Sequence, residues 1–274
     1  MPELPEVETI KRDLRRLLVG RTIVGVGVGW EGCVDRPSLE EFGEQIAGRR
    51  IEDVGRRGKF VVFTLSGGLA LLVHLRMTGS LLVKEASTPW EPHTRLCLGL
   101  DDGQELRFVN VRKFGRLYLV ADPEEVLGDL GPEPLDEDFR VEDFCALFNN
   151  RRGMIKPLLL NQRFIAGLGN IYVDEALFEG GLHPRRRADT LTSDELARLY
   201  GAIRHVLRQG IAEEGTSRSD YVRPDGSEGR HQNSLLVSGR AGEACPRCGT
   251  TIERLVVGGR GTYICPRCQG KPAP

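Results

Sequence analysis

The first residues of the chain combine a proline with two carboxylates. Pro2 directly follows the initiator methionine, and Glu3 and Glu6 are close by. Removal of Met1 would leave Pro2 as a free secondary amine, and an ordinary terminal amine titrates near a pH of about 7.7–8.0, so part of it is nucleophilic in a cell. Its attack on a sugar or carbonyl carbon would give an iminium ion, with Glu3 moving the protons. From this hexapeptide alone, a simple N-terminus with Pro5 at a helix start is the favoured interpretation.

Two Cys-x-x-Cys pairs lie near the other end of the chain. Cys245 and Cys248 form the first pair and Cys265 and Cys268 the second, with sixteen residues between them. This spacing is typical of four-cysteine structural zinc sites, because each short turn directs two thiolates at one point. A redox dithiol and two disulfides are the alternatives, and two pairs in one short segment favour a single structural Zn2+.

Composition limits the class of protein. A chain of 274 residues can bury a substantial core and form two domains. No apolar run is long enough to span a membrane, and the N-terminus is too charged for a signal peptide. The three remaining cysteines are scattered and the total is odd, which fits buried thiols in a reducing cytosol.

Charge is distributed unevenly although the net charge is only −1. Ten acids and one base lie between residues 122 and 143, whereas six bases and two acids lie between residues 240 and 274. Arginine clusters at 151–152 and 185–187 add two basic regions. Separated poles allow a near-neutral protein to bind a polyanion on one face, although a solvated surface is the commoner origin of a charge run.

Hydrophobic periodicity predicts three regions. Pro5 begins a helix that ends at Gly20. Strand-like runs separated by glycine turns then predict a two-layered β domain. These runs lie at 22–28, 50–54, 60–65, 70–75, 95–100, 105–109 and 116–120. After a linker at 131–134, helices are predicted at 141–148, 156–160, 170–179 and 193–212, and a loop at 214–233.

A glycine-rich turn precedes one of the predicted helices. Gly167-Leu168-Gly169-Asn170 leads into the helix at 170–179. Exposed amides at a helix N-terminus suit a phosphate. A plain N-cap is the simpler alternative and is favoured by this segment alone.

Taken together, the motifs resemble the formamidopyrimidine-DNA glycosylase family, the relatives of bacterial endonuclease VIII. The resemblance covers essentially the whole chain, in order and at compatible spacings. It rests on the segments 1–9, 57–60, 74–79, 112–115, 131–135, 167–172 and 259–269. Each segment is a modest signal, and their combination is specific.

The resemblance implies a bifunctional DNA glycosylase and abasic-site lyase that excises oxidised purines, 8-oxoguanine and formamidopyrimidines, from duplex DNA. Pro2 would attack C1′ of the deoxyribose and form a Schiff base, and β,δ-elimination would then cut the strand. Glu3 would be the general acid/base. Lys59 would contact phosphate and assist elimination. Arg260 would hold the phosphates that flank the lesion, and the resemblance links it to the second elimination.

Further positions are implied to contact DNA. Extrusion of a nucleotide leaves a gap in the stack, which Met77, Arg112 and Phe114 would fill. Without the motif, burial of Met77 and Phe114 in the core of adjacent strands is an equal alternative. The resemblance places backbone contacts at His74, His93, Arg151, Lys156 and Asn170.

Two other functions remain open. The first is an endonuclease VIII-like enzyme that acts on oxidised pyrimidines. Met77, Arg112 and Phe114 argue against it, as does Leu4. The loop at 215–221, which resembles a segment that closes over an extruded purine, argues against it as well. The second is a non-catalytic binder of damaged DNA. The presence of four residues argues against it: Pro2, Glu3, Lys59 and Arg260.

The chain also departs from the family pattern. Asn110 and Asn161 replace frequent aspartates, and Val111 replaces a common proline before Arg112. Two further departures lie near the C-terminal module, where Arg230-His231 replaces an aromatic pair and Ser238 a tyrosine. No departure removes a catalytic group. The changes at Asn110 and Asn161 bear on how Arg112 and Asn170 are held, and hence on lesion preference or rate.

We therefore expect an α+β protein with three parts. These are an N-terminal two-layered β-sandwich domain with a flanking helix at 1–131, a helical domain of the helix-two-turn-helix type at 132–233 with a lesion-capping loop at 214–233, and a four-cysteine zinc ribbon at 234–274. The expected cofactor is one structural Zn2+, and the expected partner is damaged double-stranded DNA, with no membrane. The resemblance implies a monomer in the bacterial cytoplasm, associated with the nucleoid.

Overall fold

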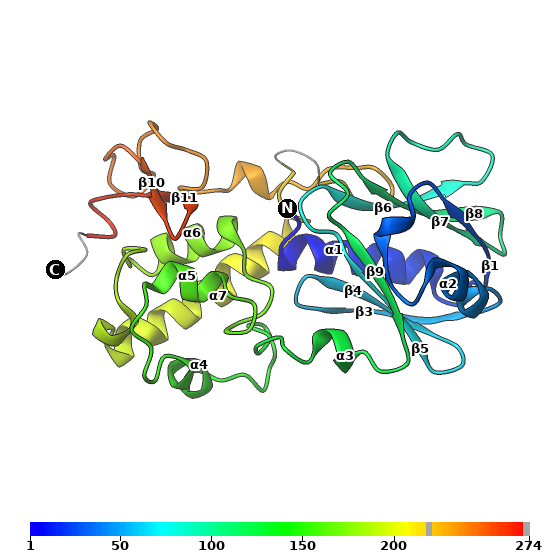
Figure 1. Ribbon diagram of the computed structural model, residues 1–274. Helices are drawn as coiled ribbons and strands as arrows, with labels where there is room; N and C mark the ends of the chain where they lie inside the picture. Colours follow the sequence, from blue (N-terminus) through cyan, green and yellow to red (C-terminus); the bar gives the residue numbers. More distant parts are fainter. Residues whose placement is uncertain (218–220, 271–274) are drawn as a thin grey trace. The chain divides into compact units, whose positions relative to one another are not determined.

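The computed structural model describes residues 1–217 and 221–270, and the chain forms two compact units (Figure 1). The first unit consists of Met1–Asp129 and Glu213–Gln232. The second consists of Leu130–Ala212 and Asn233–Pro274. No helix among the described residues is both long and apolar enough to cross a bilayer.

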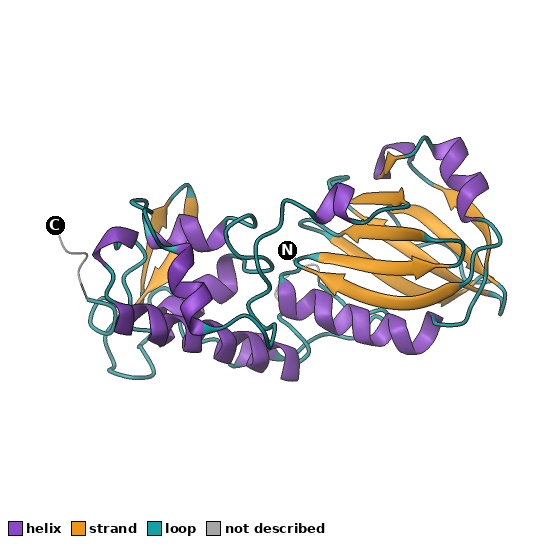
Figure 2. Cartoon of the chain, turned by 90° about the horizontal axis from the view of Figure 1, so that it is seen from below, coloured by secondary structure: helices purple, strands orange, loops and turns teal. Residues whose placement is uncertain are grey.

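Two β-sheets form the body of the first unit, which confirms the predicted two-layered domain (Figure 2). The first sheet has the order β1 (Ile23–Val28), β7 (Thr94–Leu100), β8 (Gln104–Asn110) and β6 (Gly79–Glu85). The second has the order β2 (Val34–Arg36), β9 (Arg116–Val120), β5 (Leu69–His74), β4 (Phe60–Leu65) and β3 (Ile51–Arg57). All neighbouring strands are antiparallel except β2 and β9.

Helix α1 (Leu4–Leu18) fixes the N-terminus against this body. Its apolar residues Val7, Ile10, Leu14 and Leu18 are fully buried in one core cluster with side chains from both sheets. Pro5 lies in its first turn, where a missing N–H costs nothing. The predicted helix is therefore confirmed, and its packing determines where Pro2 and the residues beside it lie.

Several elements of the first unit were not predicted. They are β2, β6, α2 (Leu39–Ile46) and α3 (Glu124–Leu127). A signal for α2 was present, because Ser38 and Glu41 form a capping box and Phe42 and Ile46 are buried one turn apart.

The second unit is helical and carries a small hairpin. Its elements are α4 (Val141–Leu147), α5 (Ile155–Leu160), α6 (Asn170–Glu179), α7 (Ser193–Ala212), β10 (Glu253–Val257) and β11 (Arg260–Ile264). Helix α6 is almost entirely buried and crosses α7 closely at Gly210. A Cβ atom on Gly210 would lie 2.5 Å from the Tyr172 ring, so only glycine permits this approach.

The segment Glu213–Gln232 packs on the first unit, whereas the sequence-based division assigned 214–233 to the helical domain. Long-range bonds explain the difference. The Thr216 N–H donates to Glu6 Oε1 at 2.8 Å, and Arg223 Nε donates to Asp13 Oδ2 at 2.9 Å. Part of the loop predicted at 215–221, residues 218–220, lies outside the described residues.

Candidate catalytic centre and nucleic-acid interface

A carboxylate at the start of α1 orders the N-terminal residues. Glu3 and Glu6 are each only 2 % exposed. The Glu3 N–H donates to Glu6 Oε2 at 2.8 Å, and the other oxygen of Glu6 accepts the Thr216 N–H. Gly215 has a φ of 85°, and a Cβ atom there would lie 2.9 Å from Glu6 Cγ. Glu6 thus joins the backbone beside Pro2 to the entry of the 213–232 segment.

Lys59 and His74 lie near each other in the five-stranded sheet, Lys59 just before β4 and His74 at the end of the neighbouring β5. Lys59 is in the turn between β3 and β4 and is 6 % exposed. The next residue, Phe60, pairs with His74 across β4 and β5, and their rings stack edge to face at 4.6 Å. His74 Nδ1 accepts the N–H of Arg76 at 3.0 Å. The proton of the neutral ring is therefore on Nε2, which is a hydrogen-bond donor.

The protonation of His74 should make the free energy of unfolding depend on pH. Burial, followed by the charges of Arg76 and Lys59, lowers the pKa of His74 to about 3. An ordinary histidine titrates near about 6.5, so between these values the unfolded chain binds a proton that the folded chain does not. Stability that is present above pH 6.5 is therefore lost as the pH falls toward 3. We expect the urea-unfolding free energy of wild type to fall more steeply from pH 6.5 to 4 than that of His74→Gln. Parallel curves would contradict this assignment.

Three side chains predicted to fill the gap in DNA lie together and face solvent. Met77 is 41 % exposed and Phe114 is 53 % exposed, which excludes the core alternative for both. Arg112 Nη1 lies 3.4 Å from Met77 Sδ, and its guanidinium carbon lies 5.9 Å from the Phe114 ring centroid. Exposed apolar side chains beside a cation suit insertion into a base stack.

His93 is held at the end of an ordered loop. It is exposed and has a φ of 71°, a conformation that is uncommon for residues other than glycine. Arg95 Nη2 lies 3.2 Å from His93 Nδ1. The preceding loop is fixed by the fully buried Arg107, which binds the carboxylates of Glu91 and Glu105 and three backbone carbonyls. Arg107 was not predicted, because no sequence pattern indicates a buried arginine in a strand.

In the second unit, Lys156 lies in a buried network of hydrogen bonds. Its side chain has no exposed surface in this structure. Lys156 Nζ donates to Asp174 Oδ1 at 2.6 Å, to Thr262 Oγ1 at 2.8 Å and to the Gly261 carbonyl at 3.2 Å. Asp174 Oδ2 accepts the Tyr263 N–H. Burial raises the pKa of Asp174 to about 7, and the Lys156 ammonium opposes this shift. The pair therefore positions β11.

Asn170 binds this hairpin, and Arg260 forms part of it. Asn170 Nδ2 donates to the Gly261 carbonyl at 3.0 Å, while its buried Oδ1 has no hydrogen-bond partner among the described residues. Arg260 begins β11 and is exposed. Gly258 and Gly259, both with positive φ, form the two-residue turn before it. Arg151 is exposed as well, and its guanidinium lies 6.0 Å from the Phe164 ring centroid.

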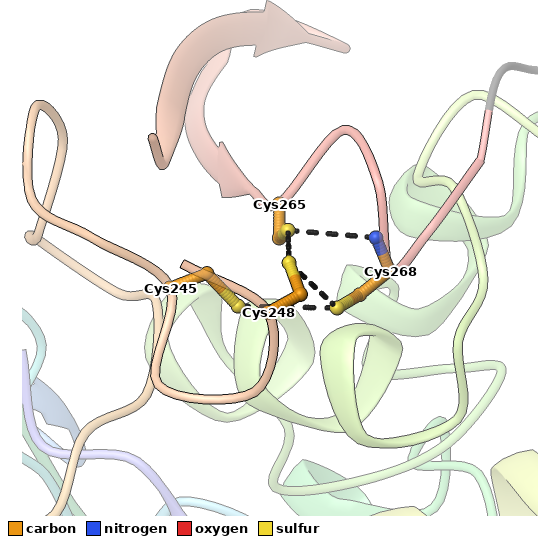
Figure 3. Close-up of side chains that lie close together, drawn as sticks. All are labelled: Cys245, Cys248, Cys265 and Cys268. Atoms are coloured by element: carbon orange, nitrogen blue, oxygen red, sulfur yellow. Dashed lines mark hydrogen bonds between the residues drawn. The ribbon is translucent and has the colours of Figure 1, made fainter. Parts of the chain in front are cut away.

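The four predicted zinc ligands converge (Figure 3). Their sulfur atoms lie within 4.8 Å of one another, with separations of 3.8 Å for Cys245–Cys268, 3.4 Å for Cys248–Cys265 and 3.5 Å for Cys248–Cys268. A tetrahedral zinc with Zn–S bonds of about 2.3 Å sets its sulfurs about 3.8 Å apart. Gln269 Oε1 accepts the Cys265 N–H at 2.9 Å and helps to hold the second pair. The donor set fits one structural Zn2+.

Models of three domain families match consecutive parts of the chain. The formamidopyrimidine-DNA glycosylase N-terminal domain matches residues 1–117, and the H2TH domain of the same glycosylase matches residues 130–221. The zinc finger found in FPG and IleRS matches residues 242–270.

Individual relatives are similar over nearly their whole length. The formamidopyrimidine-DNA glycosylase of Moorella thermoacetica is 50 % identical over 259 residues, which cover 93 % of this chain and 94 % of the relative. That of Protochlamydia amoebophila is 47 % identical over 261 residues, covering 93 % and 95 %. A crystal structure of a Lactococcus lactis FPG mutant with Fapy-dG-containing DNA has a TM-score of 0.93 at 36 % identity. The match covers 98 % of this chain and 100 % of that one.

Proposed function

Because the chain belongs to the formamidopyrimidine-DNA glycosylase family, we propose that it excises oxidised purines from duplex DNA and then cuts the strand at the abasic site. The observation that carries this proposal is the order imposed on the N-terminus. Glu6 binds the Glu3 amide next to Pro2, so the reactive amine has a defined position at the start of a packed helix. A free amine in a fixed position is what covalent attack on a sugar requires.

The first step is displacement of the damaged base. After Met1 is removed, the Pro2 nitrogen forms a bond to C1′ of the deoxyribose, and the bond from C1′ to the base breaks. The base leaves with the bonding electrons and takes up a proton. Glu3 is the proposed general acid, which protonates either the base or the sugar ring oxygen as the ring opens to the iminium ion.

The second step is elimination. The iminium withdraws electrons, so the C2′ proton becomes acidic, and its removal expels the 3′ phosphate. A further elimination releases the 5′ phosphate and leaves a one-nucleotide gap. We propose that Lys59 assists by binding phosphate and moving protons, and that Arg260 holds the phosphates next to the lesion. The zinc module presents Arg260 on its hairpin, and Zn2+ has no part in these steps.

Met77, Arg112 and Phe114 are the proposed void-filling residues. The two apolar side chains would replace lost stacking, and Arg112 would donate to the base left without a partner. His74, His93, Arg151 and Asn170 are the proposed backbone contacts.

The substrate is double-stranded DNA with oxidised purines. Similar solved structures are complexes of Lactococcus lactis Fpg proteins with Fapy-dG-containing DNA and with abasic-site-containing DNA. We infer 8-oxoguanine opposite cytosine and ring-opened purines as substrates of this enzyme, which would act as a monomer in base excision repair at the nucleoid.

Borohydride trapping tests the proposal. Untagged protein lacking Met1 would be mixed with duplexes that carry either 8-oxoguanine opposite cytosine or one oxidised pyrimidine. Borohydride reduces the iminium to a stable amine, so a covalent complex on the 8-oxoguanine duplex is the expected result. A complex on the pyrimidine duplex alone would move the enzyme to the endonuclease VIII branch. Tight binding without any complex would leave a non-catalytic binder.

A further inference from the structure

Asn110 lies between the two turns that carry the exposed apolar side chains. One turn follows β5 and carries Met77, and the other follows β8 and carries Phe114. The two strands belong to different sheets. Asn110 is the last residue of β8, and its side chain is only 1 % exposed.

The amide of Asn110 binds both turns. Its Oδ1 accepts the Phe114 N–H at 3.0 Å, and its Nδ2 donates to the Leu75 carbonyl at 3.4 Å. These partners fix which end of the Asn110 amide is the oxygen and which is the nitrogen, because a backbone N–H only donates and a carbonyl only accepts. The backbone of Asn110 reaches a third DNA-facing segment, since its N–H donates to the His93 carbonyl at 3.0 Å.

Two glycines leave room for this amide. A Cβ atom on Gly79 or on Gly115 would lie 2.9 Å from Asn110 Nδ2 in either case. Gly79 follows the first turn as the first residue of β6, and Gly115 lies after the second turn, directly before β9. The amide is therefore enclosed by both turns and fills the space between them.

Each turn also contains a residue that needs external support. Arg76 has a φ of 56° and Lys113 a φ of 58°. Such conformations persist in non-glycine residues only where surrounding contacts hold them. A second link joins the same turns, because the Arg112 N–H donates to Thr78 Oγ1 at 3.2 Å.

We propose that Asn110 is the positioning residue for the void-filling side chains. Through Leu75 and Phe114 it sets the spacing of the two turns, so that Met77, Phe114 and the intervening arginine enter the base stack as one unit. The shorter bond, from the Phe114 N–H to the Asn110 oxygen, carries most of this effect. The inference rests on the proposed function, because it assigns a role within that reaction.

The test compares two substrates that differ in whether a gap must be filled. A duplex with 8-oxoguanine opposite cytosine has a stack and an opposite base, whereas a single strand with an abasic site has neither. We expect Asn110→Ala to lower the rate of cleavage on the duplex by about tenfold or more, because a buried hydrogen bond is lost. Trapping on the single strand should stay within about twofold of wild type, since no stack is entered.

Conservative replacement separates positioning from general loss of structure. Asn110→Asp keeps the acceptor for the Phe114 N–H and should retain duplex cleavage within about threefold of wild type. A 2-aminopurine beside a tetrahydrofuran abasic analogue reports unstacking by its fluorescence. At saturating protein concentration, Asn110→Ala should give less than half of the fluorescence increase that wild type gives, and Asn110→Asp should give nearly the full increase. Thr78→Val removes the second link between the turns, the hydrogen bond from the Arg112 N–H to Thr78 Oγ1. It should reduce the fluorescence increase by a smaller factor than Asn110→Ala does. Thr78→Val is the test variant if Asn110→Ala does not fold.

Three results would overturn the proposal. They are unchanged duplex cleavage by Asn110→Ala, an equal loss on the single strand, and a loss in Asn110→Asp as large as in Asn110→Ala. If Asn110→Ala does not fold, an unchanged fluorescence increase in Thr78→Val also overturns it. Failure of the wild-type protein on both substrates is a different outcome, because it refutes the proposed function itself.

Discussion

An N-terminal extension that keeps Pro2 within a peptide bond is expected to abolish borohydride trapping. It should also lower the rate of strand cleavage at 8-oxoguanine by at least about a thousandfold, as loss of a catalytic nucleophile does in other enzymes. An amide nitrogen has no available electron pair, so it cannot attack C1′. Binding to a tetrahydrofuran duplex should fall by less than about tenfold, because the proposed DNA contacts lie elsewhere in the chain. Gel-based trapping and fluorescence anisotropy measure the two quantities.

The matched control carries the same extension at the C-terminus. That variant should trap and cleave like the untagged protein, because its N-terminal amine is free. Residual cleavage by the N-terminally blocked protein at more than about a tenth of the control rate would show that another group is the nucleophile. Loss of binding together with cleavage would indicate that the extension disturbs α1, whose first turn is packed in the core.

The parts of the site that sequence reasoning could find are carried by residues close together in the chain. The zinc ligands are two short Cys-x-x-Cys turns, and the predicted convergence of Cys245, Cys248, Cys265 and Cys268 is confirmed. The two-layered β domain was also predictable, since apolar runs bounded by glycines mark most of its strands.

Long-range contacts explain what was not predictable. Lys156 binds Thr262, 106 positions further along the chain, and no local pattern distinguishes such a buried lysine from a surface one. The 213–232 segment was assigned to the helical domain because its anchor, the bond from Thr216 to Glu6, spans 210 positions. Met77 and Phe114 are apolar, so the sequence fits burial in the core as well as exposure. Their side chains are exposed because they lie in turns whose conformation depends on tertiary contacts.

Lys156→Met is expected to destabilise the folded protein by about 3–5 kcal/mol, because it leaves the Asp174 carboxylate buried without its cation. The double variant Lys156→Met/Asp174→Leu should recover part of this loss, since neither charge remains, although the Tyr263 N–H loses its acceptor. Lys11→Met removes a part-exposed ion pair with Glu8 and should cost less than about 1 kcal/mol. Urea unfolding of the zinc-loaded proteins at pH 7 measures all three.

The same variant separates a general loss of stability from a specific effect on β11. Lys156 and Asp174 bind residues 261–263, directly after Arg260, so their loss should loosen the strand that presents this arginine. At a temperature where Lys156→Met is still folded, we expect the share of product from the second elimination to fall by about threefold or more, with the first elimination less affected, as for a lost charge-assisted contact. An unchanged ratio of the two products, measured by resolving the strand ends on a gel, would confine the pair to a role in stability. A double variant no more stable than Lys156→Met would show that the unpaired charge is not the cause of the destabilisation.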